Sequence, residues 1–82
     1  MSEVIDPKDV ERLCKKYFFE KAYVYIRRRH GNLFRHSNGK ILSYSPDEKE
    51  ISFKDDLFAE PIKIAKSDIL FIDYSRRARH GE

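Results

Sequence analysis

The first apolar residues of the chain recur at the spacing of an α-helix. Asp6 is a good N-cap, and Pro7 suits the first helical position because proline lacks an N–H that the helix would leave unpaired there. The apolar side chains that follow fall on one helical face: Val10, Leu13, Cys14, Tyr17 and Phe18. This pattern predicts one amphipathic helix over about residues 7–20.

After the helix, apolar and polar residues alternate, which is the pattern of half-buried β-strands. In the first such run, Ala22, Val24 and Ile26 alternate with Tyr23, Tyr25 and Arg27. Further short runs, separated by turn signals, cover about residues 33–37, 40–45, 51–54, 61–64 and 69–72. The period of two predicts an inner, buried face made of Val24, Ile26, Ile41, Ile51, Phe53, Ile64 and Phe71.

Asn38-Gly39 allows two interpretations of the second strand region. Asn-Gly is a strong signal for a two-residue hairpin turn between separate strands. Alternatively, Gly39 marks a sharp bend within one long strand. The number of strands is therefore five or six.

A helix followed by five or six short strands with tight connections is typical of a small β-barrel. With 82 residues the chain has room for one domain. We therefore expect a mainly β protein: a single small-barrel domain over residues 1–75, preceded by the N-terminal helix, and a basic flexible tail over residues 76–82.

Four segments resemble the strand succession of Sm-like small barrels, a rhythm shared with SH3-like barrels: residues 39–44, 51–55, 62–64 and 67–72. The resemblance extends over residues 7–74. It implies an N-terminal helix, five strongly bent strands, a glycine bend in the second strand and a tight turn before the fifth.

The sequence departs from the Sm pattern at the RNA pocket. The loop after the glycine-bent strand, residues 45–50, lacks the family's Asn, and Ala65-Lys66 stands where the family has Arg-Gly. The resemblance therefore implies the shape without the uridine pocket. Ring assembly, which is typical of the family, is not carried over, so homo-oligomerisation is left open.

Charge is unevenly distributed along the chain, whose net charge is +3. Residues 27–40 contain five basic residues and no acidic one, whereas residues 46–60 contain six acidic residues and two lysines. Such polarisation suits an anionic partner at one end of the molecule. The alternative is an ordinary solvated charged surface.

The candidate nucleic-acid site is on the first strand, where Tyr23, Tyr25, Arg27 and Arg29 share one face. Tyrosine rings can stack on unpaired bases, at about 1–3 kcal/mol per base, while arginines contact phosphates. The other basic residues expected to contribute are Arg28, Arg35 and Lys40, and Arg76, Arg77 and Arg79 in the tail. In the alternative interpretation, which we favour slightly, Tyr23 and Tyr25 lie beneath the helix and cover its apolar face, while the arginines stay exposed in either case.

Catalytic chemistry has little support in the sequence. Cys14 lies on the apolar helical face, which predicts a buried structural thiol rather than a nucleophile. The three histidines, His30, His36 and His80, have no metal-site spacing. We therefore expect no catalytic residue, no metal and no cofactor, and a binding module rather than an enzyme.

Cysteine content and hydropathy predict a soluble, cytoplasmic protein. One cysteine cannot form an internal disulfide, the N-terminal residues do not form a signal peptide, and the apolar runs are too short to span a membrane. The leading functional hypothesis is nucleic-acid binding, RNA before DNA, through the basic face. The alternative is a protein-interaction or assembly module that uses Leu57, Phe58 or a sheet edge, although we expect these two side chains to fold back and plug the barrel end.

Overall fold

The helix forms where the sequence predicts it. The computed structural model describes residues 5–76, and in it α1 spans Pro7–Glu20. The carboxylate of Asp6 caps the helix by accepting a hydrogen bond from the N–H of Lys8 at 2.8 Å. At the other end Lys21 adopts a left-handed conformation with φ 56°, which turns the chain toward the sheet.

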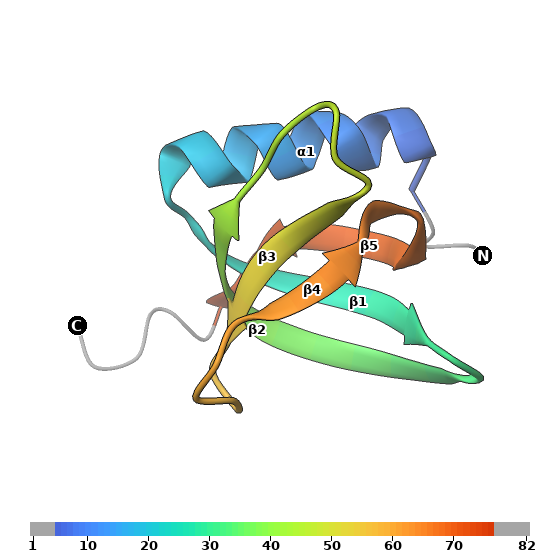
Figure 1. The fold of residues 1–82 in the computed structure, drawn as a ribbon, viewed down its shortest axis with the longest axis vertical. Coiled ribbons are helices and arrows are strands. Elements are labelled where there is room, and N and C mark those ends of the chain that lie inside the picture. Colours follow the sequence, from blue (N-terminus) through green and yellow to red (C-terminus); the bar gives the residue numbers. More distant parts are fainter. Residues whose placement is uncertain (1–4, 77–82) are drawn as a thin grey trace.

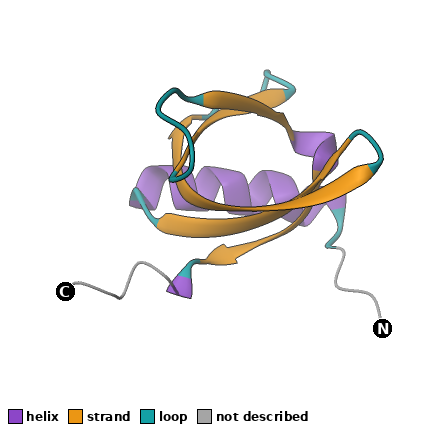
Figure 2. Cartoon of the chain, turned by 90° about the horizontal axis from the view of Figure 1, so that it is seen from below, coloured by secondary structure: helices purple, strands orange, loops and turns teal. Residues whose placement is uncertain are grey.

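Five antiparallel strands make one sheet (Figure 1). They are β1 Tyr23–His30, β2 Leu33–Ser43, β3 Glu50–Asp55, β4 Ile62–Ala65 and β5 Ile69–Tyr74. The short 3₁₀-helix η1, Lys66–Asp68, joins β4 to β5. The strand order is β4-β3-β2-β1-β5, so the last strand returns to pair with the first. The sheet curls strongly but is not closed, because β4 and β5 form its two edges (Figure 2).

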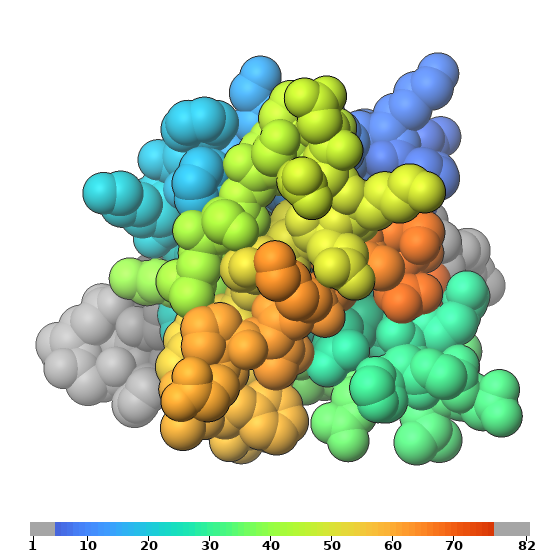
Figure 3. All heavy atoms as spheres, in the orientation of Figure 1, coloured from blue at the N-terminus to red at the C-terminus, as the bar shows by residue number. Residues whose placement is uncertain are grey.

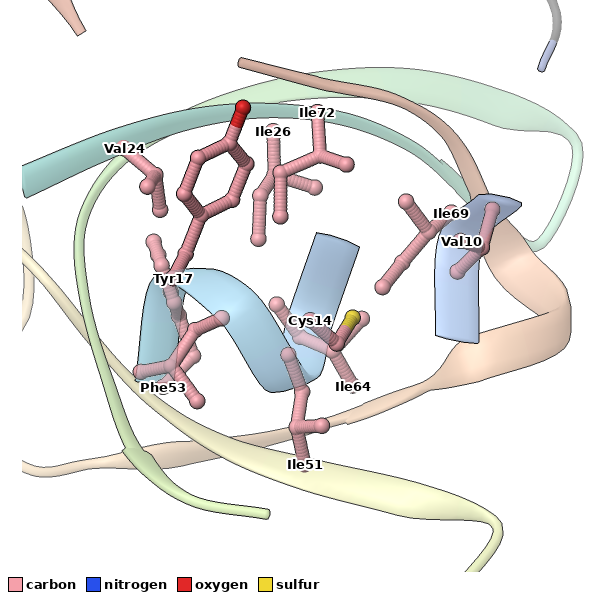
Figure 4. Packing of buried hydrophobic residues seen from close by; sticks show 11 residues of the cluster. Val10, Cys14, Tyr17, Val24, Ile26, Ile51, Phe53, Ile64, Ile69 and Ile72 are labelled. Carbon is pink, nitrogen blue, oxygen red and sulfur yellow. The ribbon is translucent and has the colours of Figure 1, made fainter. Parts of the chain in front are cut away.

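α1 lies across one end of the curled sheet (Figure 1), and the core lies between the helix and the inward side chains of the strands (Figure 4). Val10, Cys14 and Tyr17 of the helix pack into the inward residues of the strands. Six of the seven residues predicted for the inner face are buried, which confirms the period-two interpretation of β1 to β4.

Phe71 is the exception, and its predicted burial on the inner face is wrong. In the register of β1 and β5, Ile72 lies opposite the inward residue Ile26, and Phe71 lies opposite Arg27. Neighbours across an antiparallel pair share a face, so Ile72 takes the inner position and the half-buried Phe71 the outer one.

Gly39 lies inside the single long strand β2, so the bend interpretation is confirmed and the Asn38-Gly39 hairpin is wrong. The hairpin between β1 and β2 instead turns at Gly31 and Asn32, where Gly31 has φ 63°. A glycine at the first position of a two-residue loop is a favoured hairpin arrangement. Across residues 5–76, α1 is the longest helix, and no helix has the length and apolar character needed to cross a membrane.

Candidate nucleic-acid interface

The face of the sheet turned away from α1, here called the outer face, brings together residues of several strands. Tyr25 of β1 lies between Asn38 of β2 and Asp73 of β5. By the same register, the part of the outer face around β1 includes Tyr23, Tyr25, Arg27, Arg29, Phe34, His36, Asn38, Lys40, Lys54, Phe71 and Asp73. Aromatic and basic side chains dominate this set. Asp73 is the acid within it, and Glu50 lies on the same face farther away, on β3.

The interpretation in which Tyr23 and Tyr25 lie beneath the helix is wrong. The apolar face of α1 packs on the opposite side of β1, against Val24 and Ile26. That side buries aliphatic surface without having to pair a phenol group, so it is the better partner for the helix. Tyr23 and Tyr25 are only half-buried on the outer face.

Ring contacts connect the three strands across the outer face. The Tyr25 ring stacks on His36 with centroids 5.7 Å apart, and the Tyr25 hydroxyl lies 2.5 Å from Nδ1 of that histidine. On the other side, the ring of Phe71 lies 6.1 Å from that of Tyr25. The guanidinium of Arg27 lies 6.0 Å from the Phe71 ring, within cation–π range. The result is a connected strip of rings and cations.

Arg28 does not belong to this surface, and its predicted exposure is wrong. It lies on the inner side of β1, opposite Arg35 of β2, and only 7% of its surface is exposed. Its Nε has no hydrogen-bond partner. Burial lowers the pKa of the guanidinium and Arg35 acts in the same direction, whereas Asp55 and Asp68 oppose them. Strand alternation explains the placement, because Arg28 follows Val24 and Ile26 at a spacing of two.

The other basic residues that were predicted to bind nucleic acid do not all lie on the outer face. Arg29 and Lys40 are exposed on the outer face with the half-buried Arg27, and Lys54 of β3 lies beside Lys40. Arg35 is exposed, but on the other side of the hairpin. The tail residues Arg77 and Arg79 lie outside the described residues.

A shallow pocket of about 390 Å³ lies on the outer face at the β5 edge. Its lining residues are Tyr25, Asn38, Phe71, Asp73, Tyr74 and Arg76. Of these, Tyr25 and Arg76 were predicted from the sequence to bind nucleic acid. Asn38, Phe71 and Asp73 could be found only from the strand register, which brings β2 and β5 to either side of Tyr25.

Two projections of the molecule are further candidates for binding (Figure 3). The end of the β1–β2 hairpin exposes Leu33 and Phe34. The loop between β3 and β4 exposes 76% of Leu57 and 40% of Phe58, so the expectation that they plug the barrel end is wrong. Asp55 accounts for this, because its Oδ1 and its carbonyl accept the N–H groups of Leu57 and Phe58 in a tight turn.

Cys14 is fully buried, as predicted. Burial raises the pKa of its thiol to about 12, so the folded protein holds no thiolate at this position near neutral pH. In the described part of the chain, no three His, Cys, Asp or Glu side chains are grouped so that they could hold a metal ion.

Comparisons with protein-family models, curated proteins and solved structures found no match to this chain. Its fold and site are therefore interpreted from its own residues.

Proposed function

We propose that the protein binds single-stranded nucleic acid, RNA before DNA, through the outer face of β2, β1 and β5. The supporting observation is the arrangement of Tyr25 and Phe71 beside Arg27, Arg29 and Lys40 on the sheet face that α1 leaves uncovered. Half-buried rings are suited to stacking on unpaired bases, and the cations around them are suited to contacting phosphates. A duplex would hide its base faces from the rings, which favours single strands.

We also propose that the architecture is that of an Sm-like or SH3-like small barrel. The order β4-β3-β2-β1-β5, the glycine bend inside β2 and the η1 turn before β5 support this assignment. The preference for RNA over DNA rests on this resemblance. Cytoplasmic location and the absence of catalysis, metal and cofactor stay predictions.

The test measures binding of a fluorescent single-stranded RNA of mixed sequence at several salt concentrations. Single-stranded DNA and both duplexes serve as competitors. We expect the logarithm of the binding constant to fall linearly with the logarithm of salt concentration, because each phosphate contact releases counterions. The variant Arg27→Glu/Arg29→Glu should bind at least about tenfold more weakly and with a shallower slope. Arg28 is left unchanged, because a buried glutamate there would disturb the fold.

The matched control is Lys8→Glu/Lys15→Glu, which makes the same change in charge at exposed positions of α1. If binding depends on the outer face, this control should keep nearly all of its affinity and the folding of both variants should be intact. The proposal fails if the wild type shows no salt-sensitive binding to any of the four nucleic acids. It also fails if the control weakens binding as much as the outer-face variant.

A protein-assembly function is the second candidate, and the exposure of Leu57 and Phe58 specifically favours it. Apolar side chains at the tip of a braced turn are suited to anchoring in a partner's pocket. If the protein assembles through this loop, light scattering after size exclusion should show an oligomer that Leu57→Asp/Phe58→Asp dissociates. The outer-face variant should leave that oligomer unchanged. A wild-type monomer at all concentrations would exclude self-assembly.

A further inference from the structure

The pocket on the outer face has the layout of a site that holds one planar ring. Tyr25 forms its floor, and Asn38 and Asp73 rise from the neighbouring strands on either side. Two strand spacings separate these side strands by about 10 Å, which leaves room for a flat base between the two polar side chains. Phe71 adds a second ring, 6.1 Å from Tyr25.

Asn38 presents a hydrogen-bond donor to the pocket. The hydroxyl of Ser75 donates to Oδ1 of Asn38 at 2.7 Å. This bond uses one of the two lone pairs of the amide oxygen and restrains the orientation of the side chain. The amide nitrogen, with two N–H groups, can then donate to a ligand.

Asp73 presents an acceptor from the opposite side. Its Oδ1 accepts the backbone N–H of Tyr74 at 2.8 Å and faces the hydroxyl of Tyr17 at 3.5 Å. These contacts hold the carboxylate in place and leave Oδ2 to accept hydrogen bonds from a ligand.

A donor on one side and a carboxylate on the other suit guanine better than any other base. Guanine has two adjacent donors, N1–H and the N2 amino group, on one edge, and two acceptors, O6 and N7, on another. A carboxylate can accept both donors at once. Adenine and cytosine place an acceptor beside the amino group, and uracil has one donor between two acceptors, so each would bring an acceptor toward Asp73.

We infer that this pocket binds one unpaired guanine of the nucleic-acid strand, stacked on Tyr25, with Asp73 accepting from N1–H and N2–H and Asn38 donating to O6 or N7. The inference rests on the proposed function and assigns a base preference to the same surface. Asp73 repels phosphates, so the strand backbone runs instead along the cations Arg27 and Arg76 that flank the pocket.

The test compares short oligouridine strands that carry guanosine, inosine, adenosine or uridine at one central position. Inosine lacks only the N2 amino group of guanosine. Wild-type protein should bind the guanosine strand at least about tenfold more tightly than the others, because a hydrogen bond to a charged group is among the stronger ones. Asp73→Asn should bring the four affinities to within about twofold of each other while binding stays salt-sensitive.

The matched control is Asp56→Asn, which removes the same charge from an exposed loop position and should keep the preference for guanosine. Thermal unfolding of both variants checks that they fold. If the wild type binds all four strands equally and with salt sensitivity, the guanine pocket is wrong and the proposed function stands. A guanosine preference that survives in Asp73→Asn overturns the role of Asp73. Failure of every strand to bind overturns the proposed function and the pocket together.

Discussion

Gly39 is the residue at which two strands come closest. A Cβ placed on it would lie 1.9 Å from the carbonyl oxygen of Lys54 and 2.8 Å from the carbonyl carbon. Both are backbone atoms of β3, so they cannot rotate away as a flexible side chain would. The close approach of β2 to β3 therefore depends on the absence of a side chain at this position.

We predict that Gly39→Ala lowers the free energy of unfolding by about 3 kcal/mol, because β2 and β3 must move apart to admit the methyl group. The control is Gly31→Ala in the hairpin loop, where a Cβ would meet nothing within 4 Å but φ is +63°. Gly31→Ala should therefore lose only the free energy that a side chain costs in the left-handed conformation, about 1–2 kcal/mol. Urea denaturation of both variants measures the difference, and equal losses would contradict the assignment of a steric role to Gly39.

Arg28 shows what a residue pattern can and cannot predict. The alternation along β1 places Arg28 on the side of Val24 and Ile26, and Arg27 and Arg29 on the other. All three arginines were nevertheless predicted to be exposed, because a basic run is normally solvated. Burial and the like charge of Arg35 on β2 lower the pKa of the Arg28 guanidinium, and the carboxylates of Asp55 on β3 and Asp68 on η1 oppose them. These residues belong to other elements, so no local pattern in β1 predicts their effect.

At the level of elements, α1 is tied to the sheet by a polar cluster as well as by the core. Nζ of Lys66 lies 3.0 Å from Oε1 of Glu11 and donates to the carbonyl of Ser45 at 2.8 Å. Tyr44 donates its hydroxyl to the same carboxylate. The cluster therefore joins the helix, η1 and the segment that follows β2. The Lys66 side chain is only 12% exposed, so its hydrogen bonds replace most of its hydration.

This cluster predicts a pH dependence of stability. The hydrogen bond from Tyr44 lowers the pKa of Glu11 and Lys66 adds to the effect, whereas burial opposes it. Because the folded pKa is the lower one, ionised Glu11 stabilises the fold fully above its unfolded pKa of about 4.3. That stabilisation is lost as the pH falls through the folded pKa.

Glu11→Gln should therefore be less stable than the wild type at pH 7, and the difference should be smaller at pH 3, because the stabilisation is lost as the carboxyl becomes protonated. We expect a difference of about 1 kcal/mol or less, because the Glu11 side chain is 41% exposed and screened by solvent. Urea denaturation at the two pH values measures it, with Glu60→Gln in an exposed loop as the control. A difference that is the same at both pH values would contradict the role of ionised Glu11.

Element types were predictable because their periods are local properties. The N-cap at Asp6 and the apolar face from Val10 to Phe18 were enough to place α1, and period-two runs placed the strands. Asn38-Gly39 shows the limit of prediction from local patterns, since the dipeptide Asn-Gly by itself favours a turn. Pairing of β2 with β1 on one side and β3 on the other keeps the strand continuous, which is a tertiary effect.

At the scale of the whole molecule, the choice of face by α1 decides which surface can bind a ligand. Both faces of β1 contain large side chains, so the sequence left that choice open. Once α1 covers Val24 and Ile26, the strip around Tyr25 is available. The first strand's contribution, Tyr25, Arg27 and Arg29, was predictable from the sequence. From β2 only Lys40 was predicted, because Asn38-Gly39 could also be interpreted as a turn. The contribution of β5 was not predictable, because β1 and β5 are distant in sequence and their register is not encoded in any one segment.

The same packing makes the helix and the sheet parts of one core. Cys14 lies on the face of α1 that contacts the strands, and none of its surface is exposed. A reagent can reach the thiol only when α1 separates from the sheet. Small domains with a single core usually unfold in one cooperative transition. Cys14 is therefore a probe of whether the helix can open separately from the rest of the fold.

We predict that alkylation of Cys14 at neutral pH requires global unfolding. The folded thiol is inaccessible, and burial raises its pKa to about 12, so reaction needs an opened state in which the thiolate forms at its ordinary pKa. When opening is fast relative to alkylation, the free energy of opening from the labelling rate should equal the free energy of unfolding from urea denaturation. The variant Ser43→Cys/Cys14→Ala has its only thiol at an exposed position and provides the alkylation rate of a freely accessible thiol. If Cys14 reacts with an opening free energy well below the global value, α1 detaches as a separate unit, and the single cooperative core is wrong.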